Sequence, residues 1–505
     1  MPIIVAMDLP TRPAIDADAA YRALLARDAR LDGRLFVGVT STGVYCRPIC
    51  RVRTPRRENC RFFDTPAQAE AAAFRPCLKC RPEIAPGPGF AWSVMDASRT
   101  LARQAAQWID AHAHAADEGE ATSLAALARR LGVSDRHLRR IFAAEHGVTP
   151  LQYVQTRRLL LAKQLLTDTA MPISQVAHAS GFRSLRRFNA AFAGNYRLSP
   201  SRLRREGADE PKTAADGVCA TLAFREPFAR EELLRFLAQR AIPGVEQVDN
   251  MRVRRTLRPG AVGAAGGWFE AAFVPQRPLL KLRCSASLMA ATGSLLAAVR
   301  RWLDLDADPQ AMAAALDGLP GSDGLRLPGG IDGFELAVRA ILGQQVTVAA
   351  ARTLARRIVE RFGEPIATSW PELDRCFPAP SVLAGAALEP IAELGIIRTR
   401  AAAIVGLARA WPDVQPLLQA DGPAAPLIGR LCAVPGIGPW TAHYVAMRAL
   451  GWTDAFPPGD VAVLNALGLA RGARAEREAE ARSQAWRPWR SYAVLKLWNS
   501  LETRP

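Results

Sequence analysis

Four cysteines near the start of the chain have the spacing of a metal site. They form two close pairs, Cys46 with Cys50 and Cys77 with Cys80, with twenty-six residues between the pairs. Each pair can hold two sulfur ligands on a tight turn, and one tetrahedral zinc ion can close the loop between the turns. The first pair lies in the basic segment 45–53, and a purely structural zinc site does not need that charge. The pattern predicts a zinc thiolate site that meets a phosphate backbone, with a structural zinc knuckle as the alternative.

Zinc binding would make these sulfurs reactive. A zinc ion keeps all four thiols deprotonated near neutral pH, so each sulfur is a potential nucleophile. Four thiolates and one divalent ion carry a net charge of about −2. Methylation of one sulfur would remove one unit of negative charge and weaken the repulsion between the site and DNA phosphates. Methylation of a sulfur would thus act as a built-in switch for DNA binding.

A second chemical pattern lies in the C-terminal part of the chain. A Pro-Gly-x-Gly turn, with Gly436 and Gly438, is expected between two helices. Such a turn exposes backbone N–H groups at a helix N-terminus and can hold a DNA phosphate without reading the sequence. Twenty residues beyond Trp440, the lone carboxylate Asp460 precedes an apolar helix expected over 461–469. On the residues alone, Asp460 is either a helix N-cap or a catalytic group near a DNA-binding hairpin.

Length and charge limit the kinds of protein that this chain can be. At 505 residues it should hold about three or four domains, because single cores rarely exceed about 250 residues. The formal net charge of +17 favours a polyanionic partner, with nucleic acid ahead of a membrane. No apolar run is long enough to span a bilayer and no signal-peptide pattern begins the chain, so we expect a cytoplasmic protein with reduced thiols. The alternative is an extracellular disulfide framework.

Changes in composition divide the chain into four regions and a linker. A Pro/Gly-rich stretch over 82–89 closes the cysteine region, and the Gly-rich stretch 257–267 is expected to be a long hairpin loop within a sheet. The expected domains are 1–85, 90–205, 218–315 and 316–505, with a polar linker at 206–217. The predicted fold class is multidomain α+β: a small zinc-bound α/β domain, an all-α tandem helix-turn-helix domain, a small α+β sheet domain and a mainly α-helical helix-hairpin-helix core.

The second region repeats a helix-turn-helix pattern. Residues 124–131 make one helical face, Gly132 supplies a turn, and Ser134 can cap a second helix; a similar unit surrounds Gly181, about fifty residues later. Between residues 124 and 205 there are fifteen Lys and Arg residues against three Asp and Glu. Arginines of the second helices are therefore expected to contact DNA, and a helical bundle with a solvated basic face is the alternative. The arginines are Arg136, Arg139, Arg140, Arg183, Arg186 and Arg187.

Residues 124–205 resemble the AraC/XylS-type tandem helix-turn-helix domain over their whole length. The likeness rests on the Gly-Phe pair at 181–182, the serine-led helix that follows it, and the Ser-Pro pair at 199–200. The resemblance implies sequence-specific binding to promoter DNA and activation of transcription, with RNA polymerase as a further partner.

The cysteine region closely resembles the N-terminal domain of the Ada family of bacterial adaptive-response proteins. Members take a methyl group irreversibly from a DNA methylphosphotriester onto the first of four zinc-bound cysteines, which is Cys46 here. The resemblance implies Zn²⁺ as the cofactor and places phosphate and base contacts at Thr42, Arg53 and Arg75. It also implies a bacterial protein that is associated with the nucleoid. The sequence lacks the Pro-Cys-His-Arg nucleophile of guanine-O6 methyltransferases, so that activity is not expected.

The C-terminal region resembles the helix-hairpin-helix DNA glycosylase superfamily, most nearly its 3-methyladenine glycosylases of AlkA type. There, an Asp at the position of Asp460 stabilises the positive charge that develops on the sugar. Bifunctional relatives have a lysine where this chain has Trp440, so the resemblance implies a monofunctional hydrolase that releases alkylated purines such as 3-methyladenine. It places the base pocket at Trp440, Tyr444 and Trp498, with Gln345 as the wedge that fills the gap left by a flipped base.

Other parts of this half are expected to be structural. Residues 218–315 resemble the accessory N-terminal domain of AlkA-type enzymes, for which no chemistry of its own is expected. The alternative for the pocket aromatics is that they belong to the core, and this applies more to Trp486 and Trp489 than to Trp498. There is no C-terminal cluster of four cysteines, so an iron–sulfur enzyme is not expected.

The resulting hypothesis is a fusion of an Ada-type methyl-sensing activator with a complete AlkA-type glycosylase. Its partner would be double-stranded DNA, as alkylated DNA and as promoter DNA. The protein is expected to be a monomer without a membrane partner. The alternative is a methylation-responsive transcription factor whose glycosylase-like half only binds DNA. The two hypotheses differ in whether Asp460 and its aromatic neighbours do chemistry.

Overall fold

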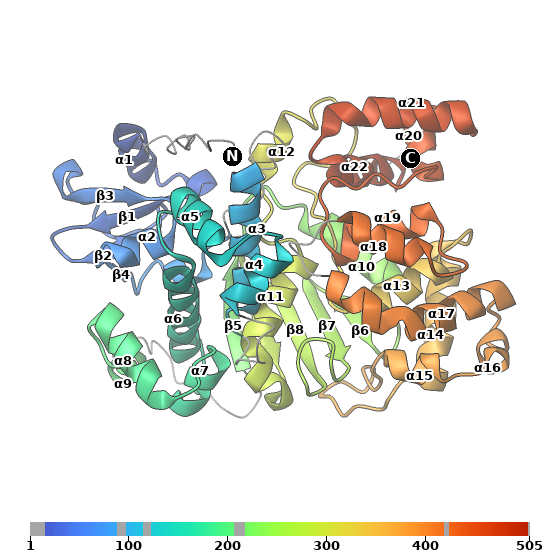
Figure 1. Cartoon of the computed structure of the whole chain (residues 1–505), viewed down its shortest axis with the longest axis horizontal. Coiled ribbons are helices and arrows are strands. Elements are labelled where there is room, and N and C mark those ends of the chain that lie inside the picture. The colour runs from blue at the N-terminus through green and yellow to red at the C-terminus, as the bar shows by residue number, and fades with distance from the viewer. Residues whose placement is uncertain (1–15, 88–96, 115–122, 207–217, 419–423, 503–505) are drawn as a thin grey trace, which may run out of the picture. The chain divides into compact units, whose positions relative to one another are not determined.

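A computed structural model of the protein describes residues 16–87, 97–114, 123–206, 218–418 and 424–502. The chain divides into two compact units (Figure 1). The N-terminal unit comprises residues 1–88, 92–167 and 172–210, and the C-terminal unit comprises 211–505 with the short segments 89–91 and 168–171. None of the described helices is both long and apolar enough to cross a lipid bilayer.

The cysteine region is built on a small sheet whose strand order is β3-β1-β2-β4. Its elements are α1 Ala17–Leu25, β1 Phe36–Val39, β2 Val44–Cys46, β3 Cys60–Phe63, α2 Pro66–Ala71 and β4 Arg75–Pro76. β1 pairs antiparallel with β2 and β3, whereas β2 and β4 are parallel. Gly38 is needed in β1 because a Cβ there would meet the rings of Phe63 and Phe74 at 2.8 and 3.0 Å. The sheet therefore packs closely against its aromatic side chains.

The rest of the N-terminal unit is helical. The helices are α3 Ala97–His112, α4 Leu124–Arg130, α5 Asp135–His146, α6 Pro150–Asp168, α7 Ile173–Ala179, α8 Leu185–Tyr196 and α9 Pro200–Glu206. Ser123, Ser134 and Ser184 cap α4, α5 and α8, and each accepts a backbone N–H three residues further on at 3.1–3.2 Å. Gly132 and Gly181 form the turns with φ of +68° and +83°, where glycine has no steric penalty. The two predicted helix-turn-helix units are confirmed.

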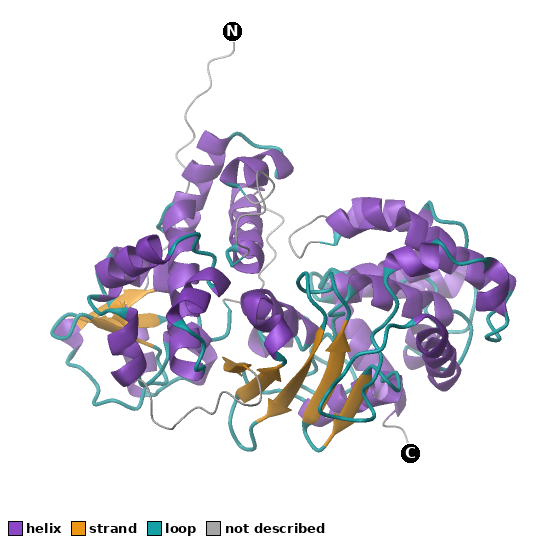
Figure 2. Cartoon of the chain, turned by 90° about the horizontal axis from the view of Figure 1, so that it is seen from below, coloured by secondary structure: helices purple, strands orange, loops and turns teal. Residues whose placement is uncertain are grey.

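The C-terminal unit begins with a five-stranded antiparallel sheet of order β5-β9-β8-β7-β6, separate from the first sheet (Figure 2). Its strands are β5 Val218–Ala223, β6 Glu246–Asp249, β7 Arg252–Leu257, β8 Gly267–Phe273 and β9 Leu279–Cys284, and its helices are α10 Arg230–Arg240 and α11 Thr292–Trp302. β7 and β8 pair on either side of residues 258–266, so the predicted long hairpin loop is confirmed.

The remaining residues form a helical core. Its helices are α12 Pro309–Ala313, α13 Gly333–Leu342, α14 Val348–Phe362, α15 Pro380–Ala384, α16 Leu388–Ala392, α17 Arg398–Val414, α18 Ala424–Cys432, α19 Pro439–Ala449, α20 Val461–Ala466, α21 Ala473–Ser483 and α22 Arg490–Glu502. They enclose two clusters of buried apolar side chains, one containing Phe334 and Trp411, the other Trp486 and Trp489. Trp486 and Trp489 are thus core residues, and the architecture as a whole agrees with the predicted fold class.

Buried ion pairs join the sheet to the helical core. Arg255 of β7 bridges Glu246 of β6 and Glu335 of α13. Arg339 of α13 contacts the same two carboxylates at 2.5 and 3.0 Å. Removing one partner would leave an unpaired buried charge, at a cost of about 3–5 kcal/mol. The sheet and the helical core are therefore held in a fixed relation within this unit.

Candidate functional site

The four cysteines converge on one site in the N-terminal unit. Their sulfur atoms all lie within 4.8 Å of one another. β2 ends at Cys46, and its parallel pairing with β4 brings Cys77 alongside, where the Cys77 N–H donates to the Tyr45 carbonyl at 2.9 Å. Zn–S bonds of about 2.3 Å in a tetrahedron separate the sulfurs by roughly 3.8 Å, so these four residues fit a zinc ion. The pairing of β2 with β4 therefore brings the four predicted zinc ligands together.

Part of the positive charge beside the cysteines is neutralised within the site. Arg47 is 4% exposed and forms an ion pair with Asp32, which is also 4% exposed. Its backbone N–H donates to the Cys80 sulfur at 3.3 Å, and its guanidinium donates to the Cys80 carbonyl at 3.1 Å. The following arginines, Arg51 and Arg53, are exposed. Arg47 therefore supports the metal loop, and the exposed arginines remain for an external anion.

Of the residues predicted to contact DNA around Cys46, Thr42 and Arg53 are exposed and Arg75 is half-buried. Thr42 is exposed in the turn before β2, and its hydroxyl donates to the Val39 carbonyl at 3.3 Å. Arg75 is half-buried in β4, where it pairs with Val44 of β2. Strand pairing therefore brings Arg75 close to the turn that carries Thr42, although the two are separated by more than thirty residues in the sequence.

A polar interface joins the cysteine region to the helices of the same unit. One Glu70 oxygen accepts hydrogen bonds from the Tyr45 and Tyr196 hydroxyls at 3.1 and 3.2 Å, and the other accepts from Thr156 at 3.1 Å. These three donors are all buried, so the carboxylate points inward although Glu70 as a residue is half-buried. Burial raises the pKa of Glu70 to about 8 against the opposing effect of its hydrogen bonds. Tyr45 precedes Cys46, so the interface reaches the metal site directly.

A buried ion pair strengthens this interface. The Lys163 ammonium of α6 lies 2.5 Å from the Glu83 carboxylate, and their side chains are 1% and 0% exposed. Burial raises the pKa of Glu83, but Lys163 and Arg81 outweigh burial and hold it below its usual value. Glu83 lies three residues after Cys80. Residues beside both cysteine pairs are therefore joined to the helix-turn-helix region, Tyr45 through Glu70 and Glu83 through Lys163.

The predicted DNA-reading arginines are all on the surface. Those of the first unit are carried by α5, and those of the second lie at or just before the start of α8. Arg139 pairs with Asp135 at 2.7 Å, one turn earlier on the same helix. The six exposed arginines are Arg136, Arg139, Arg140, Arg183, Arg186 and Arg187. Their exposure on the second helix of each unit suits contact with a polyanion.

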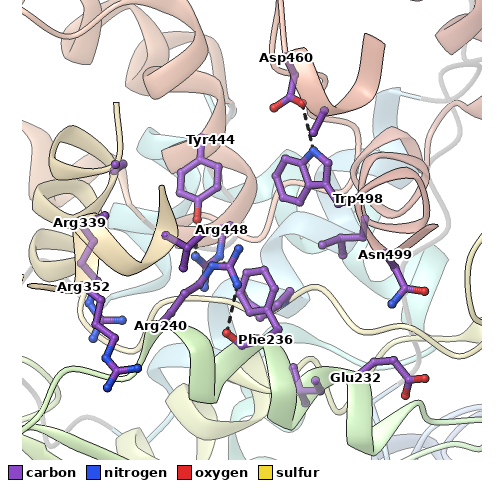
Figure 3. A pocket seen from close by; sticks show the side chains of 18 of the residues that line it. Glu232, Phe236, Arg240, Arg339, Arg352, Tyr444, Arg448, Asp460, Trp498 and Asn499 are labelled. Carbon is purple, nitrogen blue, oxygen red and sulfur yellow. Dashed lines mark hydrogen bonds between the residues drawn. The ribbon is translucent and has the colours of Figure 1, made fainter. Parts of the chain in front are cut away.

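The C-terminal unit contains a cavity of about 480 Å³. Trp440, Tyr444, Asp460 and Trp498 all line it, although fifty-eight residues separate the first from the last. In Figure 3 the Tyr444 and Trp498 side chains lie next to each other, with Asp460 beside Trp498. The volume suits a single base-sized ligand rather than a macromolecule. Four of the predicted site residues therefore meet at one cavity.

Asp460 is both a helix cap and part of the cavity wall. One carboxylate oxygen accepts the Val463 N–H at 2.8 Å and the Trp498 indole N–H at 3.1 Å. The other oxygen accepts the Trp440 indole N–H at 2.9 Å. Asp460 is 6% exposed. The predicted N-cap is confirmed, and the three donors fix the carboxylate in one orientation at the cavity.

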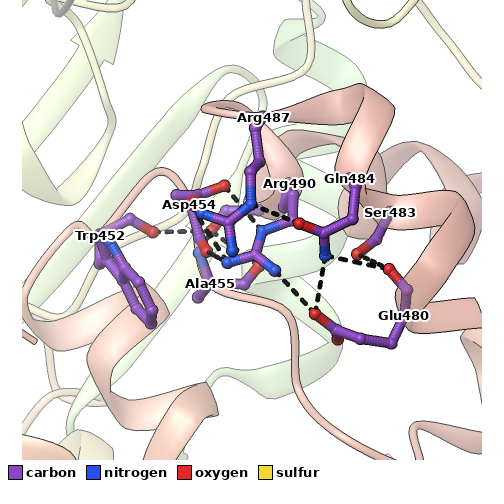
Figure 4. A network of polar contacts seen from close by, with 9 residues as sticks. Trp452, Asp454, Ala455, Glu480, Ser483, Gln484, Arg487 and Arg490 are labelled. Carbon is purple, nitrogen blue, oxygen red and sulfur yellow. Dashed lines mark hydrogen bonds and ion pairs between the residues drawn. The ribbon is translucent and has the colours of Figure 1, made fainter. Parts of the chain in front are cut away.

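The loop that leads to Asp460 is clamped by arginines (Figure 4). Arg490 donates to both carboxylate oxygens of Asp454 at 2.7 and 3.1 Å and to its carbonyl at 2.7 Å. Arg487 adds a contact to the same carboxylate at 2.6 Å. The Ser491 hydroxyl donates to the Trp452 carbonyl at 2.6 Å. The basic, Trp-rich segment after α21 thus positions the catalytic candidate rather than lining the cavity.

The aromatic side chains around the cavity are arranged for stacking. Trp440 and Tyr444 are nearly parallel, with ring centroids 5.2 Å apart and 12° between their planes. The Tyr444 and Trp498 centroids are 6.3 Å apart at 39°. Electron-rich faces of this kind attract a cationic ring more strongly than a neutral one. The cavity can therefore take up a flat heterocycle next to the Asp460 carboxylate.

The sheet region contributes side chains to the lining of the cavity, although no chemistry of its own was expected for it. Phe236 and Arg240 of α10 line the cavity together with Arg339 and Arg448 of the helical core. The reason is that α10 packs on α14 and carries its side chains across the boundary between the two regions. Arg448 is one helical turn after Tyr444, a spacing that could have revealed it. No local signal marks Phe236 or Arg240, because helix periodicity does not identify the opposing surface.

The glycine hairpin and the loop before α14 contact each other. Gly436 has φ of +89°, and a Cβ there would meet Ala403 at 2.8 Å, so glycine is required. The Gln344 amide donates to the Gly436 carbonyl and to the Thr441 hydroxyl, both at 3.0 Å. Gln345 is exposed, has φ of +53° and does not line the cavity. Gln345 therefore lies outside the cavity, and its role as the wedge that fills the gap left by a flipped base stays a prediction.

The hairpin ends where α19 begins. Gly438 is the N-cap of α19 with an extended backbone, φ −88° and ψ 174°. The helix starts with Pro439, which has no N–H, so the first free donors belong to the next residues. This arrangement leaves backbone N–H groups at the helix start for an anion. Trp440 lies in the first turn of the same helix, which links the hairpin to the cavity.

Comparisons with known proteins cover almost the whole chain. Four family models match: the metal binding domain of Ada over 19–83, a helix-turn-helix domain over 127–206, the AlkA N-terminal domain over 219–332, and the HhH-GPD superfamily base excision DNA repair protein over 338–491. The DNA-3-methyladenine glycosylase 2 of Escherichia coli is 37% identical over 279 residues, 55% of this chain and 96% of that protein. The bifunctional transcriptional activator/DNA repair enzyme Ada of Escherichia coli is 34% identical over 163 residues, 32% of this chain and 42% of that protein.

Both halves together are also matched by a single protein. The probable bifunctional transcriptional activator/DNA repair enzyme AlkA of Mycobacterium tuberculosis is 38% identical over 500 residues, which are 96% of this chain and 97% of that protein. The order of the matched domains is the order of the regions along this chain. The chain therefore belongs to the family of the bifunctional transcriptional activator/DNA repair enzyme AlkA.

Proposed function

We propose that this protein removes alkylated purines from DNA with its C-terminal unit and senses DNA methylation with its N-terminal unit. The observation that carries the proposal is the Asp460 carboxylate, fixed by two indole N–H groups at the wall of an aromatic cavity. A transcription factor that only binds DNA does not need a base-sized cavity with an oriented carboxylate. The alternative in which this half only binds DNA is therefore disfavoured.

Base removal would proceed by hydrolysis. The flipped base stacks on the aromatic rings, and the bond between the sugar C1′ and the base nitrogen breaks with both electrons going to the base. Positive charge then develops on the sugar, and the Asp460 carboxylate stabilises it electrostatically. Water adds to C1′ and leaves an abasic site. Trp440 cannot form a Schiff base with the sugar, so no strand cleavage is expected.

The test compares wild type with Asp460→Asn on methylated duplex DNA. Asn keeps a carbonyl oxygen for the α20 cap but has no negative charge for the sugar. We expect release of 3-methyladenine under single-turnover conditions to fall by roughly 10²–10³-fold, with the melting temperature changed little. Chromatography of the released base measures the rate. Equal release by the two proteins would disprove the role of Asp460 and the mechanism with it.

Methyl transfer is proposed for Cys46. Bound zinc supplies the chemistry by keeping the cysteine sulfurs as thiolates. The Cys46 sulfur attacks the methyl carbon of a phosphotriester, an S–C bond forms, and the C–O bond breaks with its electron pair left on the phosphate. The products are a thioether and a phosphodiester. The exposed Thr42 and Arg53 and the half-buried Arg75 near Cys46 support this choice, since they can position a phosphate.

Mass spectrometry of the digested protein tests this assignment. After incubation with methylphosphotriester DNA, one methyl group is expected on the peptide that carries Cys46. The matched control is the same incubation with unmethylated DNA. A methyl group on Cys50, Cys77 or Cys80 instead would overturn the assignment.

Methylation is proposed to activate the helix-turn-helix region for binding to promoter DNA. Loss of one negative charge at the zinc site lowers the repulsion from phosphates, and the six exposed arginines in α5, in α8 and just before α8 provide the contacts. Footprinting with methylated and unmethylated protein tests this step, and equal protection by both forms would contradict it. RNA polymerase as a partner, association with the nucleoid and the monomeric state remain predictions that accompany this proposal.

A further inference from the structure

The cavity floor contains an arginine that is held by three hydrogen bonds to the protein. Arg448 is 6% exposed, and its guanidinium donates to the Pro328 carbonyl at 2.7 Å and to the Gly329 carbonyl at 3.3 Å. A third donor contacts the Tyr444 hydroxyl at 2.5 Å. The guanidinium also lies over the Phe236 ring, 4.9 Å from its centroid. These contacts hold Arg448 in one position below the aromatic rings (Figure 3).

The Tyr444 hydroxyl is a hydrogen-bond acceptor in this contact. A guanidinium has no lone pair to offer, so the hydroxyl must accept from Arg448 and keeps its own proton for another group. In the part of the chain that the structure describes, the hydroxyl donates to no other residue. Tyr444 lines the cavity and is half-buried. An acceptor on a bound ligand is therefore the group that this proton can reach.

Positive charge makes this hydroxyl a stronger donor. Burial by itself raises the pKa of Tyr444, but Arg448 and Arg240 outweigh burial and lower the pKa below that of a free tyrosine. The same positive charges oppose a cationic ligand, whereas the aromatic walls favour one. The floor and the walls of the cavity therefore select different features of the ligand. A flat ring fits both parts of the cavity if it stacks on the aromatic walls and carries a hydrogen-bond acceptor on the edge that faces the Tyr444 hydroxyl.

We propose that the Tyr444 hydroxyl donates a hydrogen bond to a ring nitrogen or carbonyl oxygen of the leaving base, and that Arg448 is the positioning residue for this hydroxyl. The proposal rests on the base excision proposed above. When a neutral purine leaves, the electron pair of the glycosidic bond makes the base transiently anionic, and the hydroxyl stabilises that charge until the base takes a proton from the attacking water. When a cationic methylpurine leaves, the base departs neutral and the proton of the water goes to solvent.

The two classes of base should therefore respond differently to loss of the hydroxyl. The experiment measures single-turnover release from two duplexes, one with hypoxanthine as the neutral base and one with 7-methylguanine as the cationic base. The full-length Tyr444→Phe protein keeps the stacking ring and loses only the hydroxyl. We expect hypoxanthine release to fall about ten- to hundredfold and 7-methylguanine release to fall less than about threefold.

Two further variants keep the test decisive. Arg448→Lys retains a positive charge but cannot make all three donor contacts, so it should reproduce the selective loss in part; if Tyr444→Phe unfolds, this variant is used instead. Tyr492→Phe removes a buried hydroxyl that donates to Asp304 at 2.8 Å away from the cavity lining. As the matched control, it should change the ratio of the two release rates by less than twofold.

The outcomes separate this proposal from the proposed function. Equal losses on both substrates, or no loss on either, would show that the hydroxyl has no role toward the leaving base. Release of 7-methylguanine but not hypoxanthine by wild type would also overturn the proposal while leaving base excision intact. If wild type releases neither of these bases nor 3-methyladenine from DNA to which it binds, the proposed excision itself is refuted.

Discussion

Glu70 and Asp460 are two carboxylates with similar partners and different surroundings. Glu70 accepts hydrogen bonds from two tyrosines and a threonine, and Asp460 accepts them from two tryptophans and a backbone N–H. The hydrogen-bond partners of Glu70 come from the cysteine region and the helix-turn-helix region, and they surround its carboxylate. Asp460 instead lies at the wall of a cavity.

The difference shows what a functional carboxylate requires here. A strongly shifted pKa is often taken as a sign of a catalytic group, and the pKa of Glu70 is raised to about 8. Its hydrogen bonds, however, connect parts of the protein, and Glu70 is not among the residues that line the described cavity. Access to a cavity, together with aromatic walls that can bind a base, distinguishes Asp460. Burial and hydrogen bonding alone would have selected both residues.

Removal of zinc should have the largest effect and should separate the two carboxylates. Structural zinc sites contribute on the order of 10 kcal/mol to folding, so a chelator should unfold the cysteine region and loosen the segment around Tyr45 and Glu70. Hydrogen exchange mass spectrometry measures this loss, with metal analysis to confirm zinc release. Release of 3-methyladenine should change less than twofold. Unchanged exchange around Glu70 in the zinc-free protein would contradict the link between the metal and this interface.

The second effect is a pH dependence that belongs to Glu70. Its pKa is raised from an ordinary 4.5 to about 8, so the folded state holds the proton more tightly than the unfolded state. The resulting stabilisation is complete below pH 4.5 and is lost as the pH rises through 8. The stability lost between pH 4.5 and pH 8 has an upper limit of about 5 kcal/mol. The actual loss should be smaller, because Glu70 is half-buried and solvent screens its charge.

Glu70→Gln provides the measurement. In urea titrations of the zinc-saturated protein, the free energy of unfolding of the N-terminal unit should fall between pH 6 and 9 in wild type, and less in Glu70→Gln. Base release should be the same in both proteins. Parallel pH profiles for wild type and variant would show that Glu70 stays ionised in the folded protein.

The third effect is on the rate of base release, when Asp460 or Glu70 is replaced by the corresponding amide. Asp460→Asn removes the charge at the cavity and should slow release of 3-methyladenine by roughly 10²–10³-fold, as expected for loss of an electrostatic stabiliser. Glu70→Gln is the matched control and should alter release less than twofold. Comparable rate losses from both substitutions would mean that the cavity is not what distinguishes Asp460.

The smallest effects come from single aromatic donors. Trp498→Phe keeps a ring in the cavity but removes an N–H from Asp460, and it should slow base release about tenfold, the range for a hydrogen bond to a charged group. Tyr196→Phe removes an O–H from Glu70 and should lower the free energy of unfolding by about 1 kcal/mol without affecting release. Single-turnover rates and urea titrations measure the two changes. A stability loss without a rate loss in Trp498→Phe would make that indole a purely structural group.

Local sequence features predicted a large part of both units. The serine caps at Ser123, Ser134 and Ser184 depend on a hydrogen bond three residues away, and the turns at Gly132 and Gly181 depend on a single backbone conformation. These interactions are nearly independent of the rest of the protein. The spacing of the four cysteines likewise constrained one metal site, because two short loops supply all its ligands.

Features that depend on distant packing were missed or misjudged. Arg47 looked like part of a DNA-facing basic segment, but its pairing with Asp32 keeps it inside. The left-handed backbone conformation of Gln345 carried no local signal in the sequence either. Phe236 and Arg240 carry no signal of their own, since the sequence of α10 does not tell which helix it opposes.

The sequence by itself determined the metal ligands, the helix-turn-helix units, the hairpin and the candidate carboxylate. Each is set by residue types a few positions apart, where short-range geometry leaves few alternatives. Only the tertiary structure decided that Glu70 is enclosed between two regions and that Asp460 opens onto a cavity. It also decided which tryptophans enter the core and which tyrosine meets Arg448. The physical reason is that a side chain's surroundings depend on how distant elements pack, and hydrophobic periodicity specifies a buried face without specifying its partner.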